Sequence, residues 1–417
     1  MSLNNVDLLV IGSGPAGLAA AIKAKEIGVD NVNVVERAER PGGLLHQCIH
    51  NGFGLHYFKE DLTGPEYAHR FIEKAKDLDV DLQLETMVLN ISPDKEVTLS
   101  SSKEGLRKLC PKAIVLTTGC RERTRQQLMI PGTRCAGILT AGAAQRYVNV
   151  EGLMPGKEIV ILGSGDVGMI MARRLTLEGA EVKAVVEILP YVGGLIRNEV
   201  QCIHDFDIPL LLQHTITNIH GSERVEAVTI SKVDENLQQI PGTERVIKCD
   251  TLLLSVGLIP ENELSITAGV KLDPVTGGPI VNERMETNVP GIFAGGNVVH
   301  VHDLVDNVTW EAEEAGANAA DYIMGKVKPS ERKITLKTER NIRYVVPESI
   351  TGEREVTLYL RVNEPEEKVE LRIGDIYRKF FRAVIPSEML KVSLSNKEFK
   401  KLKKGTEELV VNCERKE

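Results

Sequence analysis

Two glycine-rich segments carry the clearest chemical signal in the sequence. The first consists of Gly12, Ser13, Gly14, Pro15, Ala16 and Gly17. The second has the same glycine spacing and consists of Gly163, Ser164, Gly165, Asp166, Val167 and Gly168. In such a segment the first glycine permits a tight turn, the second lets the backbone approach a pyrophosphate, and the third lets a helix pack closely on a strand. Bare amide groups at the helix start attract phosphate. Each segment is therefore a candidate dinucleotide-binding turn.

A glutamate follows each turn at the same distance. Glu36 lies 24 residues after Gly12, and Glu187 lies 24 residues after Gly163. A carboxylate at the end of the second strand of such a unit accepts hydrogen bonds from ribose hydroxyls. At the second turn it would repel a 2′-phosphate, and residues 188–190 supply no arginine to bind one. The second turn is therefore predicted to favour NAD(H) over NADP(H).

These features belong to an internal repeat with an offset of 151 residues. The offset relates Gly12 to Gly163, Gly14 to Gly165, Gly17 to Gly168, Glu36 to Glu187, and the pair Gly42-Gly43 to Gly193-Gly194. Five anchors in register indicate a duplicated βαβ unit.

The surrounding patterns predict the elements that position the turns. The first unit is predicted as strand Val6–Gly12, helix Gly14–Ile27 and strand Asn31–Glu36. The second is predicted as strand Lys157–Gly163, helix Val167–Leu177 and strand Glu181–Glu187. Apolar runs that end in glycine are typical of buried parallel strands, and two more occur at Ala113–Gly119 and Thr251–Gly257. A further strand after Val289 and a helix over Val308–Ile323 complete this part.

The last ~90 residues have a different pattern, with β alternation at Val356–Val362, Val369–Ile373 and Leu409–Val411. We expect a small, mostly antiparallel β domain there.

Composition excludes several classes of protein. The net charge of −8 argues against a nucleic-acid partner, because such proteins present a basic face. No apolar run approaches the ~18 residues of a membrane span. Seven scattered cysteines without a C-x-x-C pair indicate reduced thiols. These features predict a soluble, cytoplasmic protein.

The layout resembles the two-dinucleotide-binding-domain flavoproteins of the pyridine nucleotide-disulfide oxidoreductase superfamily, over about residues 6–327. The resemblance rests on the two turns with their glutamates, on Thr117-Thr118-Gly119, on residues 256–260 and on residues 287–297. Within the superfamily, residues 42–54 and 120–145 most resemble flavoprotein subunits of opine oxidases and hydrogen cyanide synthase. They resemble above all the NAD/FAD oxidoreductases that accompany glycerol-3-phosphate dehydrogenases.

This resemblance implies an α/β fold with two Rossmann-like domains, one inserted in the other. The FAD-binding domain would comprise residues 1–119 and 257–328, and the NAD-binding domain residues 120–256. Residues 329–417 would form the C-terminal, mostly β domain, a candidate partner interface. FAD would contact residues 12–17, Glu36, Arg37, Gly42, Gly43, Thr118, Gly119, Gly296 and Asn297. NAD would contact Gly163, Gly165, Asp166, Val167, Gly168, Glu187 and Gly257.

Two departures from the superfamily bear on the chemistry. Disulfide reductases carry C-x4-C after the first glycine pair, where this chain has Leu45 and His50 with Cys48 out of register. No thiol relay is therefore expected there. Asn297 replaces an aspartate that usually holds the FAD ribityl chain, and its amide can still accept one hydrogen bond.

The histidines offer a catalytic or a metal interpretation. His46, Cys48 and His50 alternate, as do His300 and His302, but neither spacing is a standard zinc ligand set. We therefore expect no metal site. His50 is the candidate catalytic residue because it falls where the flavin ring should lie, and packing or a surface hydrogen bond is the alternative role.

Together these patterns predict an FAD-dependent oxidoreductase that moves hydride between NAD(H) and flavin. Electrons would pass to or from a partner dehydrogenase or electron-transfer subunit in a hetero-oligomer of the glycerol-3-phosphate or opine type. One alternative is an NADH oxidase that reduces oxygen directly. Another is a non-catalytic scaffold protein that keeps its cofactors for stability.

Overall fold

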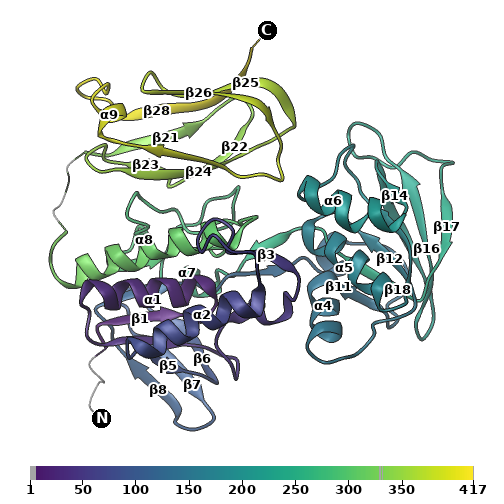
Figure 1. Ribbon diagram of the computed structural model, residues 1–417, viewed down its shortest axis with the longest axis horizontal. Coiled ribbons are helices and arrows are strands. Elements are labelled where there is room, and N and C mark those ends of the chain that lie inside the picture. The colour runs from purple at the N-terminus through teal and green to yellow at the C-terminus, as the bar shows by residue number, and fades with distance from the viewer. Residues whose placement is uncertain (1–5, 328–329, 331, 417) are drawn as a thin grey trace. The chain divides into compact units, whose positions relative to one another are not determined.

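The computed structural model describes residues 6–327, 330 and 332–416 (Figure 1). The chain divides into two compact units, which are described separately. The first unit comprises Met1–Cys120 and Pro260–Glu417, and the second comprises Arg121–Ile259. The domain boundaries predicted after residues 119 and 256 lie close to the two points where the chain passes between the units, after Cys120 and after Ile259. The boundary predicted at residue 328 lies outside the described residues.

The first unit is built on a five-stranded parallel sheet in the order β20-β9-β1-β2-β5. Its strands are β1 (Leu8–Ile11), β2 (Val32–Val35), β5 (Asp81–Gln83), β9 (Ala113–Leu116) and β20 (Ile292–Ala294). Every residue of β1 is buried, as an apolar run between two neighbouring strands requires. Helices cover the sheet, and their small or apolar faces join its core. They are α1 (Pro15–Ile27), α2 (Gly64–Asp77) and α8 (Val305–Ile323).

Smaller elements complete this sheet domain. An antiparallel meander consists of β6 (Thr86–Ile91), β7 (Val97–Ser101) and β8 (Gly105–Leu109). The others are η1 (Gly43–Gln47), β3 (Asn51–Phe53), β4 (Leu62–Thr63) and α7 (Glu263–Thr267).

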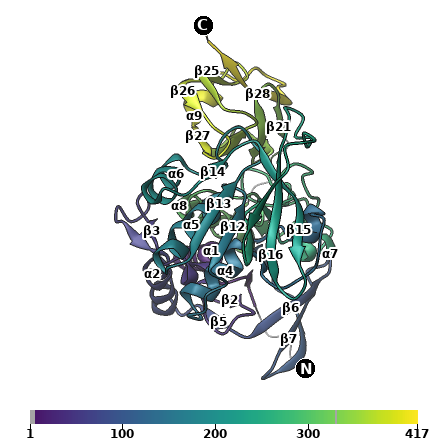
Figure 2. The ribbon, with the colours of Figure 1, turned by 90° about the vertical axis from the view of Figure 1, so that its right-hand side faces the viewer.

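The second unit repeats this topology and is turned toward the viewer in Figure 2. Its parallel sheet has the order β11-β18-β12-β13-β14. The strands are β11 (Ile138–Thr140), β12 (Glu158–Leu162), β13 (Glu181–Val186), β14 (Leu210–Leu211) and β18 (Thr251–Leu254). The meander is β15 (His214–Gly221), β16 (Val225–Lys232) and β17 (Arg245–Lys248). The helices are α3 (Arg125–Leu128), α4 (Ala141–Asn149), α5 (Asp166–Leu177), α6 (Ile196–Cys202) and η2 (His204–Phe206).

Because β12 holds the central place that β1 holds in the first unit, the sequence repeat is also a repeat of structure. The predicted α/β fold with two Rossmann-like sheets is confirmed. The segments that connect the units, β10 (Cys120–Glu122) and β19 (Leu258–Pro260), pair with one another.

The C-terminal β domain, residues 332–416, has its own apolar core. Its elements are β21 (Ile334–Thr338), β22 (Ile342–Val346), β23 (Ser349–Ile350), β24 (Val356–Val362), β25 (Glu366–Ile373), β26 (Tyr377–Val384), β27 (Leu390–Leu394), α9 (Asn396–Phe399) and β28 (Glu408–Arg415). They form a five-stranded and a three-stranded sheet in which only β21 and β28 pair in parallel. The described part is therefore mostly antiparallel, as predicted. Tyr344 and Val346 also join the core of the sheet domain, so the two parts of this unit pack together.

Candidate dinucleotide-binding sites

The first glycine turn has the backbone that its glycines predict. Gly12 has φ +104°, and a Cβ there would lie 2.6 Å from the Thr117 carbonyl oxygen. A Cβ at Gly17 would lie 1.8 Å from the Gly12 carbonyl oxygen. At Gly14, by contrast, a Cβ would have no atom within 4 Å among the described residues. The space over Gly14 is therefore open where a pyrophosphate would approach, and no side chain caps α1 there.

A serine and a glutamate close this turn. One Glu36 carboxylate oxygen, Oε2, accepts hydrogen bonds from the Ser13 amide at 2.9 Å and the Ser13 hydroxyl at 2.8 Å. The other oxygen accepts from the Ala38 amide at 2.9 Å. Since a carboxylate has about four lone-pair positions, Glu36 keeps capacity for ribose hydroxyls. The Ser13 side chain is buried against the glutamate, and the predicted cofactor contact of Ser13 stays a prediction.

The second turn has the same closure at the equivalent positions. Glu187 Oε2 accepts from the Ser164 amide at 2.8 Å and the Ser164 hydroxyl at 2.6 Å, and Oε1 accepts from the Leu189 amide at 3.0 Å. Gly163 has φ +95°, and a Cβ there would lie 2.1 Å from the Ser255 carbonyl oxygen. The repeat therefore extends from glycine spacing to individual hydrogen bonds.

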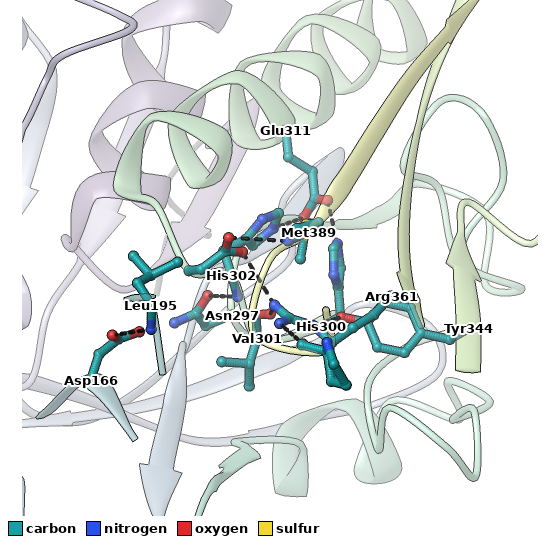
Figure 3. Close-up of polar contacts among 12 residues, drawn as sticks. Asp166, Leu195, Asn297, His300, Val301, His302, Glu311, Tyr344, Arg361 and Met389 are labelled. Carbon is teal, nitrogen blue, oxygen red and sulfur yellow. Dashed lines mark hydrogen bonds and ion pairs between the residues drawn. The ribbon is translucent and has the colours of Figure 1, made fainter. Parts of the chain in front are cut away.

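The side chain of Asp166, at the start of α5, has a structural role. Its Oδ1 accepts a hydrogen bond from the Leu195 amide at 2.8 Å (Figure 3). It accepts another from Asn198 Nδ2 at 2.6 Å. The carboxylate fixes the start of α6, and any phosphate contact here would come from backbone amides. Val167 is half-buried beside it. Gly257 has φ +95°, and its carbonyl accepts from the Arg123 amide at 3.2 Å.

Four other predicted FAD contacts lie around the first turn. Gly43 approaches the turn so closely that its Cβ would lie 3.0 Å from Gly14 Cα. The Gly42 amide donates to the Ser13 carbonyl at 2.8 Å. The Thr118 hydroxyl donates to the Glu261 carbonyl at 2.8 Å. Arg37 is exposed.

Thr117 was not among the predicted contacts. Its hydroxyl donates to the Ile11 carbonyl at 2.8 Å, which holds β9 against the turn. Gly119, two residues on, has φ +73° and open space around it.

The segment Gly296-Asn297 meets the first turn from a distant part of the sequence. A Cβ at Gly296 would lie 2.9 Å from the Ala16 Cβ. Asn297 Oδ1 accepts from the His302 amide at 3.0 Å (Figure 3). Its Nδ2 donates to Cys120 Sγ at 3.6 Å. The amide therefore uses both ends within the protein, and its second carbonyl lone pair remains for a cofactor.

This geometry agrees with the comparison with known families, in which the pyridine nucleotide-disulphide oxidoreductases match residues 6–319. The chain belongs to that family. Its members bind FAD and NAD(P)H. The match covers both glycine turns and the Gly296-Asn297 segment.

Curated relatives of this family member include components of larger enzymes. An opine oxidase subunit of Agrobacterium tumefaciens (strain Ach5) is 26% identical over 70% of this chain and 61% of its own length. Hydrogen cyanide synthase subunit HcnB of Pseudomonas protegens is 25% identical over 65% of this chain and 60% of its own length. The chain thus spans about three fifths of the length of these relatives.

Solved structures of similar fold include several reductases. Thioredoxin reductase of T. acidophilum has a TM-score of 0.61 at 23% identity, covering 77% of this chain and 98% of its own. An NAD-dependent persulfide reductase from A. fulgidus has a TM-score of 0.59 at 19% identity, covering 94% of this chain and 71% of its own. At these identities the likeness concerns the fold alone.

Unlike a disulfide reductase, this family member has no disulfide among its seven cysteines, all of which lie in the described part. Burial raises the pKa of the Cys48 thiol to about 12, so the thiolate is scarce at neutral pH. His50 pairs through Nδ1 with the Asn51 carbonyl at 2.9 Å, and its ring lies 5.1 Å from that of Phe53. Its predicted catalytic role stays a prediction.

The start of α8 holds a buried acidic side chain that the sequence patterns did not indicate. The helix begins at Val305, earlier than the predicted Val308. Asp306 in its first turn accepts from the His56 amide at 2.9 Å through Oδ2, while its buried Oδ1 has no hydrogen-bond partner in the described structure. Lys391, from the C-terminal β domain, lies 3.6 Å over the Trp310 ring of the same helix, and burial lowers its pKa to about 8.

His300, His302 and Glu311 form a second buried polar group, the His-His-Glu cluster (Figure 3). His300 Nε2 lies 2.7 Å from Glu311 Oε2, and His302 Nε2 lies 3.3 Å from Glu311 Oε1. Burial lowers the pKa of His300, which favours its neutral form. The sequence showed the two histidines but not their partner, because Glu311 lies in α8, two turns beyond the loop. In the part of the chain that is described, no helix is long and apolar enough to cross a membrane.

Proposed function

We propose that this chain is an FAD-dependent oxidoreductase that transfers hydride between NAD(H) and flavin and exchanges electrons with a second dehydrogenase subunit. The main support is the repeated turn. Two G-x-G-x-x-G turns retain their backbone, a helix start without a side-chain cap and the same serine-to-glutamate closure. A protein that had lost one dinucleotide would have no reason to keep both sets of contacts.

In this proposal FAD binds at the first turn and supplies the two-electron centre when it is bound. Gly14 admits its pyrophosphate, and Glu36 accepts from the adenosine ribose. Asn297, held by the His302 amide, directs its remaining lone pair toward the ribityl chain. The N-terminus of α8 offers a positive dipole end toward the flavin, partly offset by the buried Asp306 carboxylate.

NAD(H) is proposed to bind at the second turn. The Glu187 carboxylate is buried and fixed by three hydrogen bonds, so it cannot swing away from a 2′-phosphate. Repulsion in that low-dielectric setting favours the free 2′-hydroxyl of NAD(H).

The partner subunit is proposed from the relatives. The opine oxidase subunit and the hydrogen cyanide synthase subunit HcnB are by name parts of multi-subunit enzymes. The seven cysteines provide no internal disulfide to receive electrons. Electrons therefore need an external acceptor or donor, and a glycerol-3-phosphate- or opine-type dehydrogenase subunit is our first choice.

Two matched glycine variants test the cofactor assignment. The wild-type protein should be yellow and should bleach with NADH without oxygen. Gly165→Ala should keep its flavin but require at least about tenfold more NADH, because a Cβ there intrudes on the second turn. Gly14→Ala should lose FAD while NADH binding to the apoprotein persists. An FAD-loaded wild-type protein whose visible band ignores NADH contradicts the proposal.

The acceptor is tested on the isolated complex by flavin counting and by NADH-linked turnover with glycerol 3-phosphate or opines. Rapid NADH-dependent oxygen consumption by the chain alone would instead identify an NADH oxidase.

A further inference from the structure

The His-His-Glu cluster lies outside the two dinucleotide turns, and its side chains have no role in the proposed reaction. We propose that His300, His302 and Glu311 form a binding site for a divalent transition-metal ion, of which zinc fits the ligand set best. The sequence analysis expected no metal, because two alternating histidines are not a ligand set by themselves. The fold supplies the third ligand.

The spacing of the ligand atoms fits one small ion. One nitrogen or oxygen from each residue lies within 4.8 Å of the others. A tetrahedral zinc ion with bonds of about 2.0 to 2.2 Å keeps its ligands roughly 3.3 to 3.5 Å apart. His302 Nε2 and Glu311 Oε1 are already 3.3 Å apart. His300 Nε2 is 2.7 Å from Glu311 Oε2, a hydrogen-bond distance, and needs to withdraw by about half an ångström to leave room for an ion bonded to both atoms.

Unsatisfied imidazole nitrogens point independently to a missing ligand. Nδ1 of His300 and both ring nitrogens of His302 are buried without a hydrogen-bond partner among the described residues. The 3.3 Å approach of His302 to Glu311 does not have hydrogen-bond geometry. Each orphaned buried polar group costs about 1 to 3 kcal/mol, so native proteins rarely keep several together without an ion or water. A metal bond to His302 Nε2 would satisfy one of these three nitrogens, and a bond to His300 Nε2 would replace its present hydrogen bond to Glu311.

The cluster is enclosed, and its three ligands leave the fourth position of a tetrahedral zinc ion to a water molecule. The histidine side chains have no exposed surface and that of Glu311 is 1% exposed. The ring of Tyr344 lies 5.5 Å from that of His300, and the ring of Tyr359 lies 5.4 Å from that of His302. Aromatic walls limit access of bulk solvent and strengthen charge interactions inside.

A backbone hydrogen bond also orients the Glu311 carboxylate. The Gly296 amide donates to Glu311 Oε1 at 2.8 Å, which is the kind of second hydrogen bond that fixes a metal-ligating carboxylate. The nearby cation Arg361 is held elsewhere, because its guanidinium binds Asp303 Oδ1 and the Val301 carbonyl, both at 3.2 Å. The buried carboxylate charge therefore remains available to a cation.

A metal here would fasten two parts of the first unit. It would bind the loop that carries the two histidines to the second turn of α8. Both are covered by tyrosines of the C-terminal β domain. Because the site is enclosed, the ion would enter during folding, and its binding energy would add to stability.

The test begins with metal analysis of the full-length protein purified in zinc-containing buffer and then desalted. We expect about one zinc per chain by mass spectrometry. Removal by a strong chelator under mildly denaturing conditions should lower the Tm by several degrees, and zinc should restore it. Cobalt(II) in place of zinc should give visible d–d bands at wavelengths beyond the flavin absorption.

Two variants assign the ion to this cluster. Glu311→Gln keeps an oxygen for the Gly296 amide but removes the charge, and His302→Ala removes one ligand. Both should lose the metal. His204→Ala is the matched control, because His204 forms a 3.2 Å pair with Glu199 at the surface. It should keep metal content and Tm.

If the wild-type protein instead holds about one iron or manganese ion per chain and both variants lose it, the site is supported and only the identity of the ion changes. Wild-type protein that stays metal-free after exposure to zinc overturns the proposal, as does metal that both variants retain. These outcomes do not depend on NADH or flavin chemistry.

Discussion

At the scale of single residues, a carboxylate held by a serine decides much of what each turn can do. Glu36 and Glu187 are fixed before any ligand arrives, so the carboxylate oxygens that we propose bind ribose are already oriented. Spacing alone predicted both glutamates. Their serine partners were recognised only as members of the glycine motifs, because a sequence does not show which way a side chain turns.

Glu187→Gln should relax the preference for NADH. The amide keeps an oxygen for Ser164 but loses the charge that repels a 2′-phosphate, so the NADH-to-NADPH ratio of kcat/KM should fall roughly tenfold. Steady-state kinetics with both nucleotides measure it. Glu36→Gln is the matched control, since it changes the equivalent bond in the first turn. It should weaken FAD binding while the nucleotide ratio stays constant, and an unchanged ratio in Glu187→Gln would argue against the assignment.

Cys48 should prove dispensable for NADH oxidation. Burial raises its pKa from 9.0 to about 12, which lowers the thiolate fraction about a thousandfold at neutral pH. Alkylation followed by peptide mapping should modify the exposed Cys110 well before Cys48. Cys48→Ser should bleach with NADH at the wild-type rate. A large loss of that rate would reinstate a thiol relay.

At the scale of elements, α8 links the first turn to the C-terminal β domain. It packs along α1 through small residues, and a Cβ at Gly316 would lie 2.2 Å from the Ala20 carbonyl oxygen. The sequence predicted the helix from its alanine-rich composition. It did not predict that the helix starts at Val305, because that start depends on the buried Asp306 and its bond to the His56 amide.

Gly316→Ala should destabilise the first unit by about 1 to 3 kcal/mol, because the added methyl group forces two closely packed helices apart. Urea unfolding of the FAD-free protein measures the free energy. Gly193→Ala is the control, since its Cβ would meet no atom closer than 3.6 Å. Equal stability of the two variants would mean that α1 and α8 are not so closely packed.

At the scale of the whole molecule, the C-terminal β domain is attached to the sheet domain by buried polar contacts as well as apolar ones. Glu348 Oε2 accepts from the Val281 amide at 2.9 Å across this boundary. Burial raises the pKa of Glu348 to about 8. The carboxyl group therefore stays protonated in the folded chain at pH values where the unfolded chain has released the proton.

Stability should consequently fall as the pH rises from about 5 to about 8. In this window the folded state binds one more proton at Glu348 than the unfolded state, so the free energy of unfolding falls by up to about 1.4 kcal/mol per pH unit from this group. Urea titrations at several pH values measure the slope. Glu348→Gln should have a flatter profile than wild type, and identical slopes would exclude this origin.

Glycine spacing, glutamate positions and apolar runs by themselves determined the duplicated βαβ fold, because those signals are local and depend on backbone geometry and on which faces are buried. Only the tertiary structure decided which distant side chains meet. It joined Gly296 to Ala16, Asn297 to Cys120, and Glu311 to the two histidines. No local pattern encodes such contacts, because they arise when the loop after β20 and helix α8 pack against the sheet and the C-terminal β domain encloses them.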